Sequence, residues 1–267
     1  MNTTTTVTNE ILIRSCVGLE ELEACVDLQI ETWGYSDGDV IPRREFIVIQ
    51  QIGGQVFGAF DPLILKGAIR GGPDNLVGFA MALPGIRNSN GYLHSHMLAV
   101  RASYRNRGIG QRLKLIQRDD ALARNICLME WTFDPLEIKN AHLNIRRLGV
   151  IVRRYTPDFY GVSSSRLQAG MPTDRLHAEW WMKSARVQEA LSGILQKTEI
   201  AATILVPAAI GEWKSAPDLA RALAVQREVR DQFQQAFGRG LAVVDFERDG
   251  QGNGVFQLGI ADESALS

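Results

Sequence analysis

One stretch of the sequence, residues 98–111, decides how the rest is interpreted. It reads Leu98-Ala99-Val100-Arg101-Ala102-Ser103-Tyr104-Arg105-Asn106-Arg107-Gly108-Ile109-Gly110-Gln111. An apolar strand comes first, then a loop rich in glycine and arginine, then a helix-forming segment. Gly108 and Gly110 let the backbone approach a ligand closely, and the unpaired N–H groups at the helix start point toward an anion. Arg105 and Arg107 add donors suited to phosphate oxygens, so we predict a pyrophosphate-binding loop.

Two common pyrophosphate loops do not fit this stretch. A dinucleotide-binding fingerprint needs a third glycine three residues after Gly110, where Leu113 stands, and no Gly-Lys-Ser/Thr of a P-loop occurs. A bare Gly-x-Gly also makes a tight turn before a helix without any ligand, and this structural alternative stays open at this point.

The chain on both sides of the loop alternates strands and helices. Apolar alternation and runs predict strands at 11–14, 55–60, 76–83, 91–100, 126–133, 150–155, 174–184, 202–206, 241–247 and 255–258. Three- and four-residue spacing, caps and composition predict helices at 18–30, 42–51, 111–125, 138–148 and 218–238. This order predicts an α/β (α+β) fold with a mixed sheet. We expect a disordered tail at 1–9, a main domain at 10–184 and, after a break in composition near 186–199, a strand-helix-strand-strand extension at 185–267.

Composition narrows the function classes. The 267 residues carry 29 Lys+Arg and 30 Asp+Glu, so the near-neutral charge argues against a broadly electrostatic nucleic-acid binder. Three scattered cysteines form no disulfide framework and no zinc motif, and we expect no metal. The polar start is not a signal peptide, and no apolar run reaches the roughly 20 residues of a membrane span. We therefore expect a cytoplasmic protein that binds neither membrane nor nucleic acid.

The loop and its surroundings resemble one enzyme family. Arg105-x-x-Gly108-x-Gly110 after Leu98-Ala99-Val100 resembles the acyl-CoA pyrophosphate loop of the GNAT N-acyltransferases, Arg/Gln-x-x-Gly-x-Gly/Ala. The order of elements over residues 10–184 is similar as well. Three further stretches resemble a bacterial subgroup that has a C-terminal extension: Trp131-Thr132-Phe133-Asp134-Pro135, Asn140-Ala141-x-x-Asn144-x-x-x-Leu148-Gly149 and Tyr155-x-Pro157-x-Phe159-Tyr160-Gly161.

The resemblance implies a GNAT-like, mostly antiparallel sheet whose central strands, 94–100 and 126–133, splay apart around the pantetheine arm of acetyl-CoA or another acyl-CoA. It implies that backbone groups hold this cosubstrate, those receiving the arm being Met97, Leu98, Ala99 and Val100. Those holding the pyrophosphate would be Arg105, Asn106, Arg107, Gly108, Ile109 and Gly110. Asn140 would contact CoA or cap its helix, and one N–H near Met97 or Leu98 would polarise the thioester carbonyl.

Catalysis in the resembled family is direct attack of a neutral amine on the thioester, which a base assists. The glutamate that relatives often carry before the loop is missing here, and His94 and His96, two apart on one strand face, are the candidate bases. They also fit a structural role as polar residues of a half-buried strand. In relatives, a tyrosine acts as the general acid that protonates the departing thiolate, but Ile145 stands at that position here. Tyr155 or Tyr160 is then the candidate general acid, unless the thiolate leaves without protonation.

The acceptor side is less defined. Three arginines follow the splayed strands: Arg153, Arg154 and Arg175. Arg175 is the best candidate to bind an anionic acceptor such as an amino-acid carboxylate. The alternative is that all three are solvated surface cations without a ligand. We therefore predict an acyl-CoA-dependent N-acyltransferase that moves an acyl group, acetyl in the simplest case, to a small-molecule amine. The alternative is a non-catalytic GNAT-like domain that binds CoA or a protein partner, and a protein acceptor also stays open. The extension would cover the acceptor site, pack as a partial second domain or form a homodimer contact.

Overall fold

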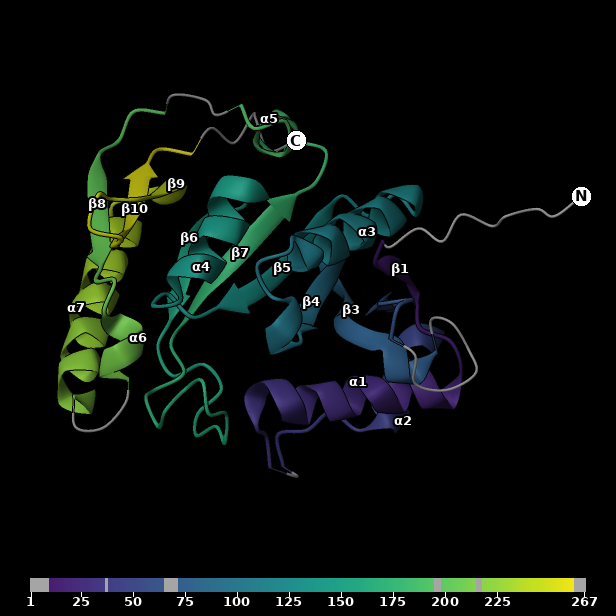
Figure 1. Ribbon diagram of the computed structural model, residues 1–267. Coiled ribbons are helices and arrows are strands. Elements are labelled where there is room, and N and C mark those ends of the chain that lie inside the picture. The colour runs from purple at the N-terminus through teal and green to yellow at the C-terminus, as the bar shows by residue number, and fades with distance from the viewer. Residues whose placement is uncertain (1–9, 37, 65–71, 195–197, 215–217, 262–267) are drawn as a thin grey trace, which may run out of the picture. The chain divides into compact units, whose positions relative to one another are not determined.

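A computed structural model describes residues 10–36, 38–64, 72–194, 198–214 and 218–261. Its helices and strands mix in the order expected of an α/β fold, which confirms the predicted fold class (Figure 1). The predicted tail, 1–9, lies outside the described residues. The chain divides into two compact units: unit 1 comprises Met1–Pro84 and Ser95–Asp120, and unit 2 comprises Gly85–His94 and Ala121–Ser267. The predicted boundary at 184/185 does not coincide with this division and stays a prediction.

Unit 1 contains the first half of the elements. They are β1 (Leu12–Ser15), α1 (Gly18–Trp33), α2 (Arg43–Gln51), β2 (Gln55–Phe60), η1 (Pro73–Asn75), β3 (Leu76–Arg87), β4 (Asn90–Val100), η2 (Ala102–Tyr104) and α3 (Ile109–Ala123). The last residues of β3 and α3 and the first residues of β4 belong to unit 2. The strand order is β1-β2-β3-β4, and β2 is antiparallel to both β1 and β3.

Helices cover both faces of the sheet in unit 1. Leu22, Cys25 and Leu28 recur every three residues on α1 and share one apolar cluster with Phe46 of α2 and Phe79 of β3. The opposite face forms a second cluster with α3 through Ile109 and Leu113. Burial of these two apolar stripes stabilises the layers, and Gly34, at φ 66°, ends α1 in the left-handed conformation that glycine adopts readily.

Strand β4 departs from strict alternation just before the loop. Ser95 hydrogen-bonds to side chains of α3, and Leu98 packs in the same cluster as α3 although it lies three positions further along. Met97 packs instead with α1 and α2. Since side chains alternate in a regular strand, the chain has one extra residue between Ser95 and Leu98, as at a β-bulge. This irregularity lies in the segment that the sequence assigns to the acyl-CoA arm.

Unit 2 contains the remaining elements. They are β5 (Leu128–Phe133), α4 (Ile138–Ala141), the π-helical η3 (His142–Arg147), β6 (Ile151–Thr156), β7 (Arg175–Trp181), α5 (Ala185–Leu191), β8 (Ala202–Val206), α6 (Ile210–Trp213), α7 (Leu219–Gly238), β9 (Ala242–Arg248) and β10 (Gly254–Gly259). The strand order is β4-β5-β7-β6-β9-β10-β8. β4 and β5 are parallel, and the other pairs in unit 2 are antiparallel.

The C-terminal extension has the predicted strand-helix-strand-strand order as β8, α7, β9 and β10. Strand β9 pairs with β6 at Val152↔Val243, so the extension continues the sheet of unit 2. Figure 1 shows the long helix α7 beside β8, which it contacts, and Phe233 of α7 packs edge-on against Phe256 of β10 with ring centroids 5.1 Å apart. Helix α5, in the stretch we interpreted as a break in composition, was missed; Val187 and Ala190 are its buried positions, and the Ser184 hydroxyl caps it.

The three cysteines are free thiols, and the Sγ atoms of buried Cys16 and Cys25 lie 3.8 Å apart. Of the helices in the described part of the chain, none is both long and apolar enough for a bilayer span.

Candidate functional site

The glycine-rich loop has the backbone conformation that its sequence demands. Gly108 has φ +75°, and Asn106, at +63°, occupies the same left-handed region. A Cβ at Gly108 would meet no atom within 4 Å, so the backbone and not a lack of space requires glycine there. Helix α3 then begins at Ile109, and its first turn closes with the Arg112 amide donating to the Gly108 carbonyl at 3.0 Å.

The start of α3 is therefore an exposed set of backbone donors. The first four N–H groups of a helix have no partner within it, and its dipole favours an anion at this end. Residues 105–108 are exposed, Ile109 is buried and Gly110 is half-buried. Arg105 Nε donates to the Val100 carbonyl at 3.2 Å, which folds the loop back on the end of β4. The six residues predicted to hold the pyrophosphate thus surround one helix N-terminus.

Two side-chain contacts stiffen the loop. The Tyr104 hydroxyl donates to Asp61 Oδ2 at 2.6 Å, and this hydrogen bond raises the pKa of Tyr104. Above the Tyr104 ring, the Arg107 guanidinium carbon lies 4.9 Å from the centroid. These contacts restrict the loop before any ligand arrives, which lowers the entropic cost of binding.

A buried polar cluster lies between β4 and α3, and the sequence analysis missed it. Lys114 Nζ donates to Ser95 Oγ at 2.7 Å, and Ser95 Oγ lies 3.0 Å from Gln117 Oε1. Burial lowers the pKa of Lys114 well below its usual value. Polar residues on the face of α3 that packs on the sheet, among apolar positions such as Leu113, were the available signal.

The two predicted histidines belong to different units. His96 belongs to unit 1, and part of its side chain is exposed. The protein atoms around the rest of the ring lower the pKa of His96 by desolvation. His94 is half-buried in unit 2, where parallel pairing of β4 and β5 sets it beside Glu130. Of the arm residues, Met97 and Ala99 are buried, whereas Leu98 and Val100 are half-buried.

Unit 2 presents polar side chains on one face of its sheet, which we name the polar face. It consists of Glu130 and Thr132 on β5 and of Arg175, His177 and Glu179 on β7. Glu130 lies opposite Glu179 and Thr132 opposite His177, and alternate residues of a strand share a face. The sequence signal was present, because Glu130 and Thr132 alternate with the apolar Met129, Trp131 and Phe133.

Two arginines compensate the two glutamates of the polar face. Arg153 Nη2 lies 2.7 Å from Glu179 Oε2. Arg87 is paired with Glu130 and lies 3.6 Å from the same Glu179 oxygen. Like charges placed opposite each other in a sheet repel, so these pairs make the arrangement tolerable.

His177 is held as a neutral ring. The Arg154 guanidinium lies 2.8 Å from Nδ1 and can only donate, so Nδ1 accepts and Nε2 carries the proton toward Thr156 Oγ1, also at 2.8 Å. Burial, followed by the charge of Arg154, lowers the pKa of His177 to about 4. With both nitrogens occupied, His177 orients its neighbours and is not a free base.

Tyr155 and Tyr160, the predicted acids, have different surroundings. Tyr155 is buried, and its hydroxyl donates to Asp174, which also accepts two bonds from Arg230. Burial and this bond to Asp174 raise the pKa of Tyr155 far above its usual value. Tyr160 is exposed and shares a 2.9 Å hydrogen bond with Thr132 Oγ1 on the polar face. Only Tyr160 therefore has an accessible hydroxyl.

Arg175 and Asn140 lie at accessible positions. Arg175 is half-buried, donates to the Asp174 carbonyl at 2.8 Å and to Gln168 Oε1 at 3.3 Å, and stacks over the Tyr160 ring. Asn140 is exposed on α4. Within the described ranges, no group of three or more His, Cys, Asp or Glu residues is placed to hold a metal ion.

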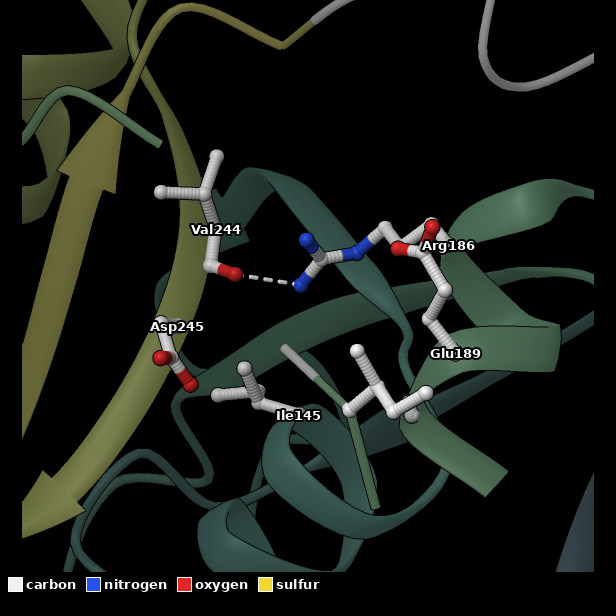
Figure 2. A pocket seen from close by; sticks show the side chains of 7 residues that line it. Ile145, Arg186, Glu189, Val244 and Asp245 are labelled. Atoms are coloured by element: carbon white, nitrogen blue, oxygen red, sulfur yellow. Dashed lines mark hydrogen bonds between the residues drawn. The ribbon is translucent and has the colours of Figure 1, made fainter. Parts of the chain in front are cut away.

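A pocket elsewhere in unit 2 contains none of the predicted site residues. It is lined by Ile145, Arg186, Glu189, Ala190, Ile194, Val244 and Asp245 (Figure 2). Arg186 donates there to the carbonyls of Gly149, Val150 and Val244. Its guanidinium thus joins α5 to β6 and β9, which is a structural task.

Comparisons with known proteins bear on the fold of this chain. Residues 24–142 match the sequence model of the acetyltransferase (GNAT) family. The crystal structure of Arabidopsis thaliana NAA60 in complex with acetyl-CoA is similar over 65% of this chain and 99% of that chain, with 16% identity and a TM-score of 0.53. NAA60 in complex with a bisubstrate analogue matches over 65% and 100% of the two chains, with 16% identity and a TM-score of 0.51. No curated protein matches the sequence significantly. These findings confirm the expected GNAT-like fold.

Proposed function

We propose, from the premise that residues 24–142 are a GNAT acetyltransferase domain, that this protein is an acyl-CoA-dependent N-acyltransferase with a small-molecule amine as acceptor. The observation that carries the proposal is the loop 105–110, which combines a left-handed Gly108, exposed arginines and the N-terminus of α3. This arrangement supports a pyrophosphate site. NAA60, a structure of the same fold, contains acetyl-CoA.

The backbone has the first role in the proposed reaction. Amides from Asn106 to Gly110 bind the pyrophosphate, whereas the Arg105 amide already donates to the Ala102 carbonyl at 3.3 Å. The irregular stretch of β4 around Met97 and Leu98 offers a backbone N–H to the thioester carbonyl. Asn140 is proposed as a further contact to CoA. An acyl-CoA held in this way presents its carbonyl carbon to the acceptor.

Side chains then move the protons. The amine nitrogen attacks the carbonyl carbon, the C–S bond breaks, and the electron pair leaves on the CoA sulfur. His94 or His96, directly or through water, takes the proton that the amine loses. The accessible Tyr160 hydroxyl gives a proton to the thiolate and regains one from solvent. Tyr155 is left out of this scheme because Asp174 occupies its hydroxyl.

Two arginines support an acceptor with an anionic group. In the described part of unit 2, Arg154 donates to the neutral His177, and Arg175 donates to a carbonyl and an amide oxygen, whereas Glu130 and Glu179 are paired with other arginines. Arg154 and Arg175 together outweigh the one remaining carboxylate of the segment, Asp158, whose Oδ1 accepts from Thr173, so the net charge beside Tyr160 is positive. Guanidinium groups bind carboxylates in bidentate fashion, so an amino acid fits this side.

One observation favours the non-catalytic alternative. The position at which the resembled enzymes have an acidic tyrosine holds Ile145, whose side chain is buried. A domain without proton donors would still bind CoA through its loop. The two functions differ in whether free thiol is released from acetyl-CoA when amines are added.

The first test is a thermal-shift titration with CoA, acetyl-CoA and succinyl-CoA. A ligand at about 100 times its Kd stabilises the folded state by about 2.7 kcal/mol, so the wild type should melt several degrees higher. Gly108→Asp should abolish the shift, because it places a carboxylate and a strained backbone at the anion site. Gly211→Asp, with an ordinary φ and open space at the start of α6, is the matched control and should keep the shift. A wild type that shows no shift with any of the three ligands rules the proposal out.

The acceptor is tested next by thiol release with pairs of amines. Each amino acid is compared with the amine that lacks its carboxylate. We expect Arg175→Met to raise KM for the amino acid about tenfold, which corresponds to one lost charge-assisted contact of about 1.4 kcal/mol. KM for the decarboxylated amine should change little. Equal effects on both members of a pair would contradict the assigned role of Arg175.

A further inference from the structure

The segment between β6 and β7, residues 157–174, carries the exposed aromatic side chains beside the polar face. Phe159 and Tyr160 contact each other edge-on with centroids 4.6 Å apart. Phe159 also packs edge-on against His177, and Tyr160 is bonded to Thr132. The segment has no helix or strand of its own, so its shape must come from hydrogen bonds to its backbone.

Those hydrogen bonds converge on Asp158, Thr173 and Asp174. Asp174 Oδ1 accepts from the Asp158 amide at 3.0 Å, and Asp158 Oδ1 accepts from the Thr173 amide at 3.0 Å. Thr173 Oγ1 accepts from the Tyr160 amide at 2.9 Å and donates to the Gly161 carbonyl at 3.1 Å. The position of Tyr160 therefore depends on where Asp174 is held.

Helix α7 of the C-terminal extension holds Asp174. Arg230 Nε and Nη2 donate to the two carboxylate oxygens, each at 2.9 Å, and Asp174 is fully buried. One turn earlier, the buried Gln226 donates to the Pro172 carbonyl at 2.8 Å. A buried carboxylate that loses its cation is strongly destabilised, so without Arg230 the segment must move to hydrate Asp174.

We propose that Arg230 and Gln226 are positioning residues for the acceptor site: through Asp174 and Thr173 they hold Phe159 and Tyr160 over the polar face, so that the C-terminal extension completes the site. The inference rests on the proposed function, because it takes this face to be the acceptor side. It gives the extension a task in the reaction, which Arg230 and Gln226 perform through Asp174 and Pro172. Arg230 acts on acceptor binding and not on acyl-CoA binding.

The test compares Arg230→Met and Arg230→Lys with the wild type in the full chain. Arg227→Met is the matched control, since Arg227 is exposed on the same helix. We measure exchange of the Asp158 and Tyr160 amides against the amides of β10, KM and kcat for the acceptor amine, and Kd for acetyl-CoA. Arg230→Met should speed exchange of the two segment amides about tenfold and raise KM about tenfold, corresponding to about 1.4 kcal/mol each. Kd for acetyl-CoA should stay within about twofold, and Arg230→Lys should fall between the two.

Several results would overturn the inference. The first is unchanged amide exchange in Arg230→Met. The second is faster exchange in Arg230→Met with an unchanged KM for the acceptor. The third is a rise of KM in Arg227→Met as large as that in Arg230→Met. If Arg230→Met does not fold, Gln226→Ala replaces it, with the same expected directions and smaller effects. Failure of the proposed function is seen separately, as a wild type that does not bind acetyl-CoA or transfers no acyl group.

A double variant separates positioning from general stability. Arg230→Met and Tyr160→Phe should be non-additive on KM, because the first change already displaces the hydroxyl that the second one removes. Additive effects mean that Arg230 acts by another route, and the inference then fails.

Discussion

At the scale of single residues, the polar face fixes one protonation state. One ring nitrogen of His177 accepts from a guanidinium, and the other donates to a hydroxyl. The folded state therefore favours the neutral form of His177. Protonation would place a second charge beside Arg154 in a buried position. The cost of that protonation should be measurable as a pH-dependent loss of stability.

We expect the free energy of unfolding to fall as the pH drops from 7 to 4. The pKa of His177 is about 4 in the folded protein and about 6.5 when unfolded, so in this range only the unfolded state binds the proton. Integrated over the range, this difference corresponds to about 3 kcal/mol. Urea unfolding of the wild type and of His177→Gln at several pH values measures this contribution. It is the difference between the two proteins in how the free energy of unfolding changes with pH. Parallel pH profiles for the two proteins would contradict the assignment.

Residues with local requirements could be predicted from the sequence, whereas residues defined by distant partners could not. Gly108 was predictable because a left-handed turn before a helix demands glycine, and the structure gives it φ +75°. Tyr155 was not, since the groups that occupy its hydroxyl network, Asp174 and Arg230, lie 19 and 75 residues away. Tyr160, five residues further along, is exposed, and the partners that hold its segment also lie far away in the sequence.

At the scale of elements, apolar periodicity predicted most helices and strands but not how they end or join. The predicted helix at 138–148 consists of α4 followed by the wider π-helical turn η3. The spacing of apolar residues does not predict the change from α-helix to π-helix. Helix α5 was missed because only two of its seven residues are buried. One side chain, Arg186, links α5 to the backbone before β6 and to β9, and this contact can be tested.

We expect Arg186→Met to destabilise the protein by about 2–4 kcal/mol. The guanidinium donates to three backbone carbonyls, on Gly149, Val150 and Val244, and buried acceptors that lose their donors cost about 1–3 kcal/mol each before the structure relaxes. Chemical unfolding measures the loss. Lys183→Met, an exposed position just before α5, is the control and should change stability by less than about 0.5 kcal/mol. Similar stability of the two variants would show that Arg186 is not a structural link.

At the scale of the whole molecule, the loop motif and the order of elements were enough to predict the fold family, because both are written in consecutive residues. The position of the extension could not be predicted, because the four ion pairs that tie it to the rest of unit 2 join residues 56 to 99 positions apart. They are Arg230–Asp174, Arg146–Asp245 and the Lys214 pairs with Asp134 and Glu137. Burial alone lowers the pKa of Lys214, but its two carboxylates outweigh this and raise it.

These ties predict that the chain does not fold without its extension. A chain that ends at Gly193 loses the β9 partner of β6 and leaves the buried Asp174 and the half-buried Asp134 without Arg230 and Lys214. An uncompensated buried charge of this kind costs about 3–5 kcal/mol, and two of them approach the whole stability of an ordinary domain, about 5–15 kcal/mol. We therefore expect no cooperative thermal transition by circular dichroism for this chain. A chain that ends at Ala261 keeps every one of these contacts and should melt like the full protein. Cooperative melting of the shorter chain near the wild-type temperature would instead support a separable domain ending near residue 184, and the extension would then be an addition to a complete acyltransferase.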